Sequence, residues 1–449
     1  KALTLYNITD ISQFKASVGL IIIISFFSMY TSAIYVLKSK YYAQVASILF
    51  VTSGYFINDA FIRIDLGELL AMGLSPMIIV GSRALVTDSR GQYLFPIGVL
   101  GILLANIPSF IASMVYLVIY FCLNIKSLYS LKALKTVLKS IAFVSIGSLF
   151  FTVPLIYHFI KGEVFAFHAL AVSYNTIGKF GINAVELFFG MKTQSGMTTK
   201  GLVISAGIIL NILFLLHFAK NYKHEKMSDL SISLTCIILC LASTQYFPWY
   251  IVSEKTPILR FIQFPWRFML IAVPAMVLIS TRTLMKINIR RVDILIISSS
   301  ILFSFYPMQN SIQNRVNEIA HHDFHDYMTT AFEKDKDLNI KYIQDLKKGK
   351  NISEITSQNS TLKFKINDHR SEIIDLPLMY YPGYSATLNG VNINLYDSEK
   401  GIASIKGPAI GLIEITYNKI ITTIPFIISI VFLLLCAFLA VYKNNKKPR

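Results

Sequence analysis

The chain has 449 residues and a formal net charge of +17, and 54% of its residues are hydrophobic but only 15% are charged. Soluble globular domains carry about a quarter charged residues, so this composition argues against a large soluble enzyme. The abundant aromatic and aliphatic residues exclude a disordered chain. A polytopic membrane protein is therefore predicted, in which the basic excess reflects nucleic acid, anionic lipid or membrane topology.

Apolar segments along the chain are predicted to be transmembrane spans or re-entrant helices, because about 20 apolar residues cross a bilayer and packed spans can be shorter. They are residues 16–37, 41–57, 67–82, 94–105, 106–124, 140–160, 201–219, 230–247, 266–283, 293–307 and 421–442. Asn106 and Pro108 interrupt the long apolar run 94–124, and a helix break is predicted there. The expected fold is an α-helical bundle of about 10–11 such helices.

The lysines and arginines predict the orientation of these spans. With the basic C-terminal tail in the cytoplasm, the short inner segments hold 19 lysines and arginines and the short outer segments hold 10. Basic runs such as 126–139 then indicate topology and contact with membrane lipids, and no nucleic-acid partner is expected. Residues 1–15 lie outside with no span before them, so an upstream span is expected to be missing from this sequence.

The bundle is predicted to comprise residues 1–307, with outer loops at 57–66, 161–200 and 248–265. The 161–200 loop carries aromatic and amphipathic stretches that are typical of interfacial helices, and an ordinary loop packed on the bundle is an equal alternative. The four cysteines lie in apolar stretches and are predicted to be small buried side chains outside any disulfide framework.

Residues 308–419 form one long polar segment, predicted to be extracytoplasmic and followed by a last span and cytoplasmic tail at 420–449. Its first part, 308–358, has the charge-rich pattern of loop and helix. From 361 onward the residues alternate between apolar and polar, and the Asn-Gly pair at 389–390 is a hairpin signal. The segment is therefore expected to contain a small antiparallel β-sandwich.

The first group of candidate site residues lies around the second predicted span. Ionisable residues at membrane depth are functional candidates because burying a charge is costly. Asp59 and Arg63 are four residues apart and can pair on one helical face, with Asp65 close by, and Glu68 opens an apolar span where its carboxylate needs a partner. A salt-bridged corner between helices is the alternative, and the spacing alone favours it.

A second group lies at a helix entrance within residues 259–270. Arg260 and Arg267 flank an aromatic, proline-containing turn, and a guanidinium beside Trp266 and helix N-terminal amides suits a phosphate group. The alternative is an aromatic belt with a snorkelling arginine. A third group, the histidines and aspartates of residues 321–326, matches no standard zinc spacing and favours a solvated loop. No cofactor is named, and a divalent metal is kept as an open alternative.

Three motifs occur in order along the chain. The second is QFPWRF at 263–268, and the third is YYPGY at 380–384 with LNG at 388–390. They follow a first motif, the pattern of Tyr55, Asp59, Arg63, Gly67, Glu68, Ala71 and Pro76. Together these motifs, in register from about residue 16 to the end, resemble the 6-pyruvoyl-tetrahydropterin-synthase-related membrane proteins of bacteria and their YfhO-like relatives.

This family looks like the GT-C superfamily of glycosyltransferases. The resemblance implies a bacterial plasma-membrane enzyme that moves a sugar from a polyprenyl-phosphate donor to a cell-envelope glycan or lipid at the outer face. It makes Arg63, Arg260 and Arg267 candidates for binding the donor phosphate. The candidates for binding the sugar or the acceptor are Asp59, Asp65, Glu68, Gln263 and Trp266.

The catalytic residue stays unknown at this stage. In GT-C proteins the expected carboxylate lies in the first outer loop, which falls before or around residues 1–15, where Asp10 is the only acid. The catalytic loop is therefore expected to lie outside this chain. A lipid or glycan transporter, a flippase and a non-catalytic protein of envelope assembly are the alternative functions.

Overall fold

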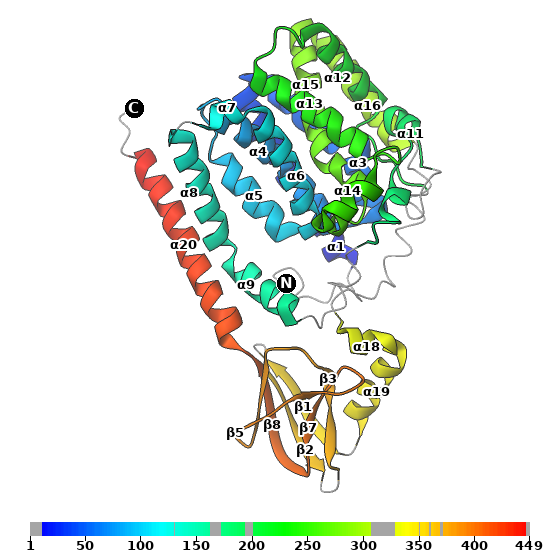
Figure 1. Cartoon of the computed structure of the whole chain (residues 1–449), viewed down its shortest axis with the longest axis vertical. Coiled ribbons are helices and arrows are strands. Elements are labelled where there is room, and N and C mark those ends of the chain that lie inside the picture. The colour runs from blue at the N-terminus through cyan, green and yellow to red at the C-terminus, as the bar shows by residue number, and fades with distance from the viewer. Residues whose placement is uncertain are drawn as a thin grey trace. The chain divides into compact units, whose positions relative to one another are not determined.

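A computed structural model describes residues 11–129, 131–161, 172–193, 201–306, 328–349, 351–358, 361–368 and 371–445 (Figure 1). The chain divides into two compact units, which are described separately. The first unit comprises residues 1–144 and 171–322, and the second comprises 145–170 and 323–449. Residues 321–326 and Asp10 lie outside the described part of the chain.

The first unit is helical in its described part. Its elements are α1 (Ile11–Leu37), α2 (Lys40–Val51), α3 (Gly54–Asn58), the π-helical turn η1 (Asp59–Arg63), α4 (Leu66–Val86), α5 (Leu94–Ala105), α6 (Ile107–Leu123), α7 (Ile125–Leu128), most of α8 (Leu131–Gly147), η2 (Ile177–Phe180), α11 (Ala184–Phe189), α12 (Ile208–Asn221), α13 (Met227–Ala242), α14 (Trp249–Lys255), η3 (Pro257–Ile262), η4 (Pro265–Phe268), α15 (Met269–Ile287) and α16 (Arg290–Phe305).

Helices α4 and α15 form the centre of this unit. Every residue from Met269 to Thr281 in α15 is buried, which requires neighbours on all sides of the helix. Helix α4 lies against α1, α5 and α15. A Cβ atom at Gly98 of α5 would lie 3.0 Å from the backbone nitrogen of Ile78, so the absence of a side chain there lets α4 and α5 approach closely.

The described residues contain a set of apolar helices, which is consistent with the predicted membrane protein. Among the described residues, four helices are long and apolar enough to cross a bilayer: Lys15–Leu37, Leu66–Val86, Pro265–Ile287 and Ile420–Ala440. The number rises to six if each of two bent helix pairs forms one span. Helices α5, α6, α12 and α13 are apolar but shorter, with 10–17 residues. The prediction of about 10–11 spans stays untested beyond this set.

Three details of the structure refine the predicted spans. Segment 41–57 is broken after Val51, and α2 is bent by 46° from α3 and η1. The hydroxyls of Thr52 and Ser53 bond to preceding carbonyls there and compete with the helical backbone. Segment 140–160 bends by 72° between α8 and α9 (Leu149–Lys161), where Gly147 and Ser148 form a pair typical of kinks. The predicted loop 57–66 is helical through Arg63.

The predicted break inside 94–124 is confirmed. Helix α5 ends at Ala105, and Asn106 has extended backbone angles and caps α6 by accepting hydrogen bonds from the backbone nitrogen and hydroxyl of Ser109. Pro108 lies in the first turn of α6, where its missing N–H has no intrahelical partner to lose. The two features that predicted the break therefore also produce it.

The second unit combines helices with a β-rich part. Its elements are α9, α18 (Thr330–Lys334), α19 (Lys336–Lys348), β1 (Ile352–Gln358), β2 (Thr361–Asp368), β3 (Ile373–Met379), β4 (Tyr384–Leu388), β5 (Val391–Ile393), β6 (Tyr396–Asp397), β7 (Ile402–Lys406), β8 (Ala409–Tyr417) and α20 (Lys419–Asn445).

The strands form two antiparallel sheets, in the orders β1-β2-β8-β4-β5 and β3-β7-β6. Both sheets contribute to one apolar core, with Phe364 and Ile413 from the first and Leu376 and Ile405 from the second. The predicted hairpin at 389–390 joins β4 to β5, and both of its residues have positive φ. Strand β1 lies in a segment predicted as loop and helix, and its polar sequence ISEITSQ hid it.

The loop predicted at 161–200 is described for residues 172–193. It forms η2 and α11 and packs on the first unit, where the side-chain amide of Asn211 donates to the carbonyls of Leu187 and Phe188. The side chains of Val185 and Phe189 are exposed. This part combines packing on the bundle with an exposed apolar face. All four cysteines are free, as predicted, although Cys122 is exposed rather than buried.

Candidate functional site

The first half of the site is built by the irregular link between α3 and α4. Residues Asp59–Arg63 form a single π-helical turn, a conformation often found at functional sites. Ile64 follows with a φ of 62°, which is strained for a β-branched residue. Asp65 then caps α4 by accepting a hydrogen bond of 3.0 Å from the backbone nitrogen of Glu68. This path places three carboxylates and one guanidinium within ten residues.

The second half is built by two short 3₁₀ helices before α15. Gln263 joins η3 to η4 with a φ of 65°, a second strained backbone position beside the same site. A proline begins each of the two 3₁₀ helices. The turn buries Trp266 and Arg267 at the start of the candidate span Pro265–Ile287.

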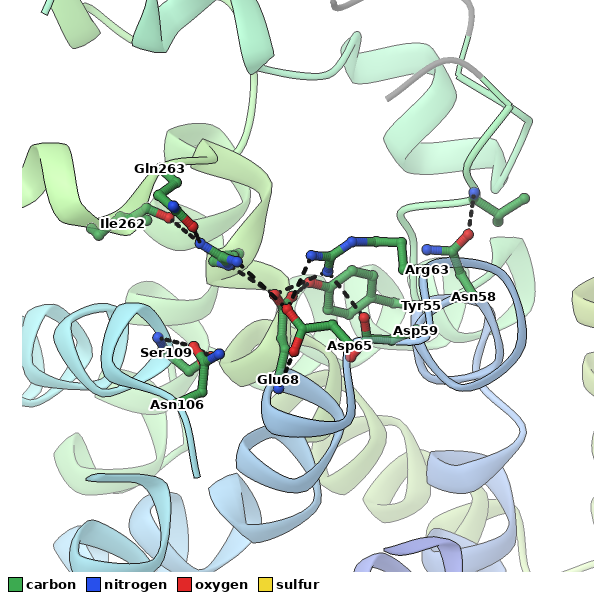
Figure 2. A network of polar contacts seen from close by, with 12 residues as sticks. Tyr55, Asn58, Asp59, Arg63, Asp65, Glu68, Asn106, Ser109, Ile262 and Gln263 are labelled. Carbon is green, nitrogen blue, oxygen red and sulfur yellow. Dashed lines mark hydrogen bonds and ion pairs between the residues drawn. The ribbon is translucent and has the colours of Figure 1, made fainter. Parts of the chain in front are cut away.

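Glu68 is the centre of the cluster and is fully buried (Figure 2). Its Oε1 accepts a hydrogen bond from the hydroxyl of Tyr55, and its Oε2 lies 2.9 Å from Nη1 of Arg63 and 2.7 Å from Nε of Arg267. One carboxylate therefore joins two guanidinium groups that are far apart in the sequence. Such charge-assisted bonds are the strong ones in a protein.

The two arginines are held by further bonds. Nη1 of Arg63 also lies 3.0 Å from Oδ1 of Asp59. Nη1 of Arg267 donates to the carbonyl of Ile262 at 2.9 Å and to the side-chain oxygen of Gln263. The side chain of Arg267 is buried, and that of Arg63 is only 14% exposed. Both guanidinium groups are thus fixed in position before any ligand arrives.

Aromatic rings form one wall of the cluster. The guanidinium of Arg63 lies 4.3 Å from the ring centre of Trp266, and that of Arg267 lies 5.0 Å from the ring centre of Phe264. The rings of Phe264 and Trp266 are stacked, and the ring of Tyr55 meets Trp266 edge to face. Each of the two guanidinium groups therefore lies against an aromatic ring.

Asp65 has the loosest contacts in the cluster. Its Oδ2 lies 3.4 Å from Nη2 of Arg63 and 3.7 Å from Nη2 of Arg267, so one oxygen faces both guanidinium groups. Its side chain is 30% exposed, more than that of Arg63, Arg267, Asp59 or Glu68. Solvent therefore reaches this cluster at Asp65.

Three buried polar atoms at the site have no hydrogen-bond partner among the described residues: Oδ2 of Asp59, Nε1 of Trp266 and Nδ2 of Asn58. The other amide atom of Asn58, its Oδ1, accepts a bond from the backbone nitrogen of Val203. Buried polar groups in native proteins are nearly always paired. One acceptor and two donors without a partner on these neighbouring segments indicate a polar ligand or ordered water.

The break between α5 and α6 lies beside this cluster. A Cβ atom at Gly67 would lie 2.8 Å from the carbonyl oxygen of Ala105 and 3.3 Å from the side-chain nitrogen of Asn106. The first turn of α4 thus approaches the broken helix closely only because residue 67 is glycine. Figure 2 shows the Asn106–Ser109 cap next to Glu68.

The structure brings together seven of the eight predicted site residues: Asp59, Arg63, Asp65, Glu68, Gln263, Trp266 and Arg267. Arg260 lies apart, and its Nε donates to the carbonyl of Val172. Tyr55 appeared only as a motif residue in the sequence, and its hydroxyl on Glu68 makes it part of the site. The observed geometry is a salt-bridged corner between helices. Whether the same residues also bind a phosphate, a sugar or an acceptor stays untested.

In the described part of the chain, no group of three or more histidine, cysteine, aspartate or glutamate side chains has the arrangement to hold a metal ion. The carboxylates of the cluster face guanidinium groups instead of one another. A divalent metal therefore stays an untested alternative, and residues 321–326 lie outside the described residues.

A second ion-pair network lies at the other ends of α4 and α15. Asp229 of α13 accepts from Arg83 of α4 at 2.5 and 3.1 Å and from Arg282 of α15 at 2.9 Å. Arg282 also pairs with Glu225, which in turn bonds to the buried side chain of His217. This network joins the helices α4, α12, α13 and α15.

Comparisons with known proteins give no identity. No family model, curated protein or solved structure matches the chain. The resemblance to the YfhO-like proteins and the GT-C superfamily, and the function it implies, therefore stay predictions.

Proposed function

We propose that the protein is a membrane glycosyltransferase that moves a sugar from a polyprenyl-phosphate donor to a cell-envelope glycan or lipid at the outer face. The supporting observation is a largely buried cluster in which two guanidinium groups, three carboxylates and aromatic rings meet at the ends of candidate spans. Sugar transfer from a lipid phosphate needs positive charge at the leaving phosphate and a base at the acceptor hydroxyl.

The residues divide between these two tasks. Arg63 and Arg267 are proposed to bind the donor phosphate, while Glu68 holds both guanidinium groups in place. Arg260 is the weaker candidate, because its Nε is already bound to a backbone carbonyl. Asp59 is proposed to bind the acceptor hydroxyl, because its Oδ2 is buried without a partner among the described residues.

The proposed step is a displacement at the anomeric carbon of the sugar. The acceptor oxygen forms a bond to this carbon, and the bond between the carbon and the phosphate oxygen breaks. The phosphate leaves with the electron pair and is stabilised by the arginines, and the hydroxyl proton passes to Asp59. The rings of Trp266 and Phe264 exclude water from the arginine side of the cluster.

The test compares two buried aspartates. Asp59 and Asp293 are both fully buried, and each has one carboxylate oxygen without a partner among the described residues. Asp293 lies in α16, where it accepts from the hydroxyl of Tyr41 instead of an arginine. In nanodiscs with a polyprenyl-phosphate donor carrying a labelled sugar, Asp59→Asn should lower sugar release by roughly 10²–10⁴-fold. Asp293→Asn should leave it unchanged.

Equal rates for Asp59→Asn and the parent protein would reject the assignment, and no release by the parent protein would reject the function. A transporter is the second candidate, because two pairs of helices are broken and one of them ends in the cluster at Arg63. Passage of the intact labelled donor across the bilayer, without release of its sugar, would identify this function. A non-catalytic assembly protein would show neither release nor passage.

A further inference from the structure

The guanidinium nitrogens of Arg63 and Arg267 fall into two groups: those with close, buried partners, and those whose partner is farther away and could be replaced by a ligand. Nη1 of Arg63 contacts the buried carboxylates of Asp59 and Glu68 at 3.0 and 2.9 Å. Nε of Arg267 bonds to Glu68 at 2.7 Å. Nη1 of Arg267 bonds to the carbonyl of Ile262 at 2.9 Å and to the side chain of Gln263. The two Nη2 atoms have no described ion-pair partner except Oδ2 of Asp65, at 3.4 and 3.7 Å. Oδ2 of Asp65 therefore occupies the point where both guanidinium groups have N–H groups without a closer partner among the described residues.

Three further observations mark this point as an anion position. Asp65 is the most exposed member among the charged residues of the cluster, so a ligand arriving from solvent or lipid meets this carboxylate first. It lies at the N-terminus of α4, a helix of 21 residues whose first N–H groups favour negative charge. Its contacts to the arginines are also longer than those of Glu68 and Asp59, so they are the easiest to exchange.

We propose that the carboxylate of Asp65 occupies a phosphate-binding position between Nη2 of Arg63 and Nη2 of Arg267, and that the phosphate of a lipid phosphate binds there by displacing it, both in the sugar-carrying donor and in the phosphate monoester left after transfer. This inference rests on the proposed function for the lipid-linked character of the ligand. The anion position itself is defined by the two arginines alone. Asp65 then acts as an internal competitor that keeps the site closed to weakly bound anions.

Charge balance supports displacement over simple addition. The cluster holds three carboxylates and two guanidinium groups, so a phosphate added without displacement would be a fourth acidic group among two cations. A phosphate and three carboxylates around the same two guanidinium groups would repel one another strongly in a buried site. A side chain that is 30% exposed can turn to solvent, whereas the fully buried Asp59 and Glu68 cannot.

The test removes the charge of Asp65 and keeps its capping role. In Asp65→Asn the side-chain oxygen still accepts from the nitrogen of Glu68, and Asp65→Ser supplies a second neutral cap. The control is Asp88→Asn, which makes the same change in net charge at an exposed aspartate paired with Lys132. The whole chain in detergent is titrated with farnesyl phosphate and, separately, with inorganic phosphate.

The reporter is the fluorescence of Trp266, whose ring lies under the guanidinium of Arg63. The chain has two tryptophans, so the titration is done in a Trp249→Phe background. Asp65→Asn and Asp65→Ser should bind farnesyl phosphate about tenfold more tightly, equivalent to about 1.4 kcal/mol. Asp88→Asn should match the parent protein, and adding Arg63→Gln to Asp65→Asn should remove the gain.

Unchanged or weaker binding by both neutral variants would overturn the proposal, as would an equal gain in Asp88→Asn. A gain for farnesyl phosphate alone supports a lipid-linked ligand, and an equal gain for inorganic phosphate supports the anion position for a free phosphate group. Sugar release is not part of this test. The anion position therefore stands or falls separately from the glycosyltransferase proposal.

Discussion

At the residue scale, Glu68 shows what the sequence predicts and what it does not. The sequence indicated that a carboxylate at the start of an apolar span needs a partner, and the spacing of Asp59 and Arg63 predicted their ion pair. The identity of the main partner, Arg267, depends on packing between segments 199 residues apart. The two motifs that carry these residues appeared separately in the sequence, and only the fold joins them.

Replacing Glu68 should show how much this junction contributes to stability. In Glu68→Gln both arginines lose a buried counter-ion, and breaking a buried pair costs about 3–5 kcal/mol in the free energy of unfolding. Denaturant unfolding in detergent, followed by circular dichroism, measures this loss. Asp88→Asn, at an exposed ion pair, should show no measurable change. Equal stability of the two variants would contradict a central role for Glu68.

Tyr381 of the YYPGY motif provides a prediction on pH. Burial, with a further contribution from Tyr384, raises the pKa of Tyr381 to about 12, whereas an unfolded tyrosine has a pKa of about 10. The folded protein thus keeps the phenol proton after the unfolded chain has lost it. The stability from this group is complete below pH 10 and is lost as the pH rises through 12.

The measurement is the midpoint of thermal unfolding at about pH 9 and about pH 11.5, on either side of the unfolded pKa. Between these two values the parent protein should lose more stability than Tyr381→Phe, which has no phenol to ionise. Parallel losses in the two proteins would show that Tyr381 does not contribute to the alkaline transition.

At the scale of elements, the site depends on irregular segments that periodicity does not reveal. A hydrophobic pattern predicted the helices and the break at Asn106, because polar and proline residues interrupt it visibly. The π-helical turn at Asp59–Arg63 has no such signal. The sequence predicted an outer segment at 57–66 and a shared helical face for Asp59 and Arg63, but not this type of turn. The left-handed angles of Ile64 and Gln263 are imposed by tertiary contacts against the preferences of these residues.

Two glycines test the close approach of α4 to the broken helix. In Gly67→Ala the new Cβ would lie 2.8 Å from the carbonyl oxygen of Ala105, so the free energy of unfolding should fall by about 1–3 kcal/mol. Gly19→Ala in α1 meets nothing within 4 Å and should raise it by about 0.5–1 kcal/mol. Denaturant midpoints of both variants give the values. A stabilising Gly67→Ala would refute the tight packing.

At the scale of the whole molecule, composition predicted the class of protein and the charge pattern predicted its orientation. The four to six candidate spans among the described residues are consistent with the predicted class, a polytopic membrane protein. Orientation has no counterpart in atomic contacts, because a helix has the same internal bonds in either direction through a bilayer. It stays a prediction from the excess of lysines and arginines on one side.

Site-directed labelling checks this orientation. In a background without the four native cysteines, Glu254→Cys in the predicted outer segment 248–265 should react with a membrane-impermeant maleimide added to intact cells. Lys126→Cys in the predicted inner segment should react only after the cells are permeabilised. Both side chains are exposed, so access to reagent depends on the side of the membrane. The reverse pattern would invert the topology.

The ion-pair networks at the two ends of α4 and α15 limit how the first unit can move. Glu68 bonds to Arg267 at one end, and Arg83 and Arg282 share Asp229 at the other, about 22 Å away along α4. Sliding or rotating one helix against the other would break charged bonds at both ends together. Helices α4 and α15 should therefore move together, and shear between these two helices is disfavoured. Any opening needed for a ligand should then occur in the short turns 59–65 and 262–264, which contain the strained residues Ile64 and Gln263.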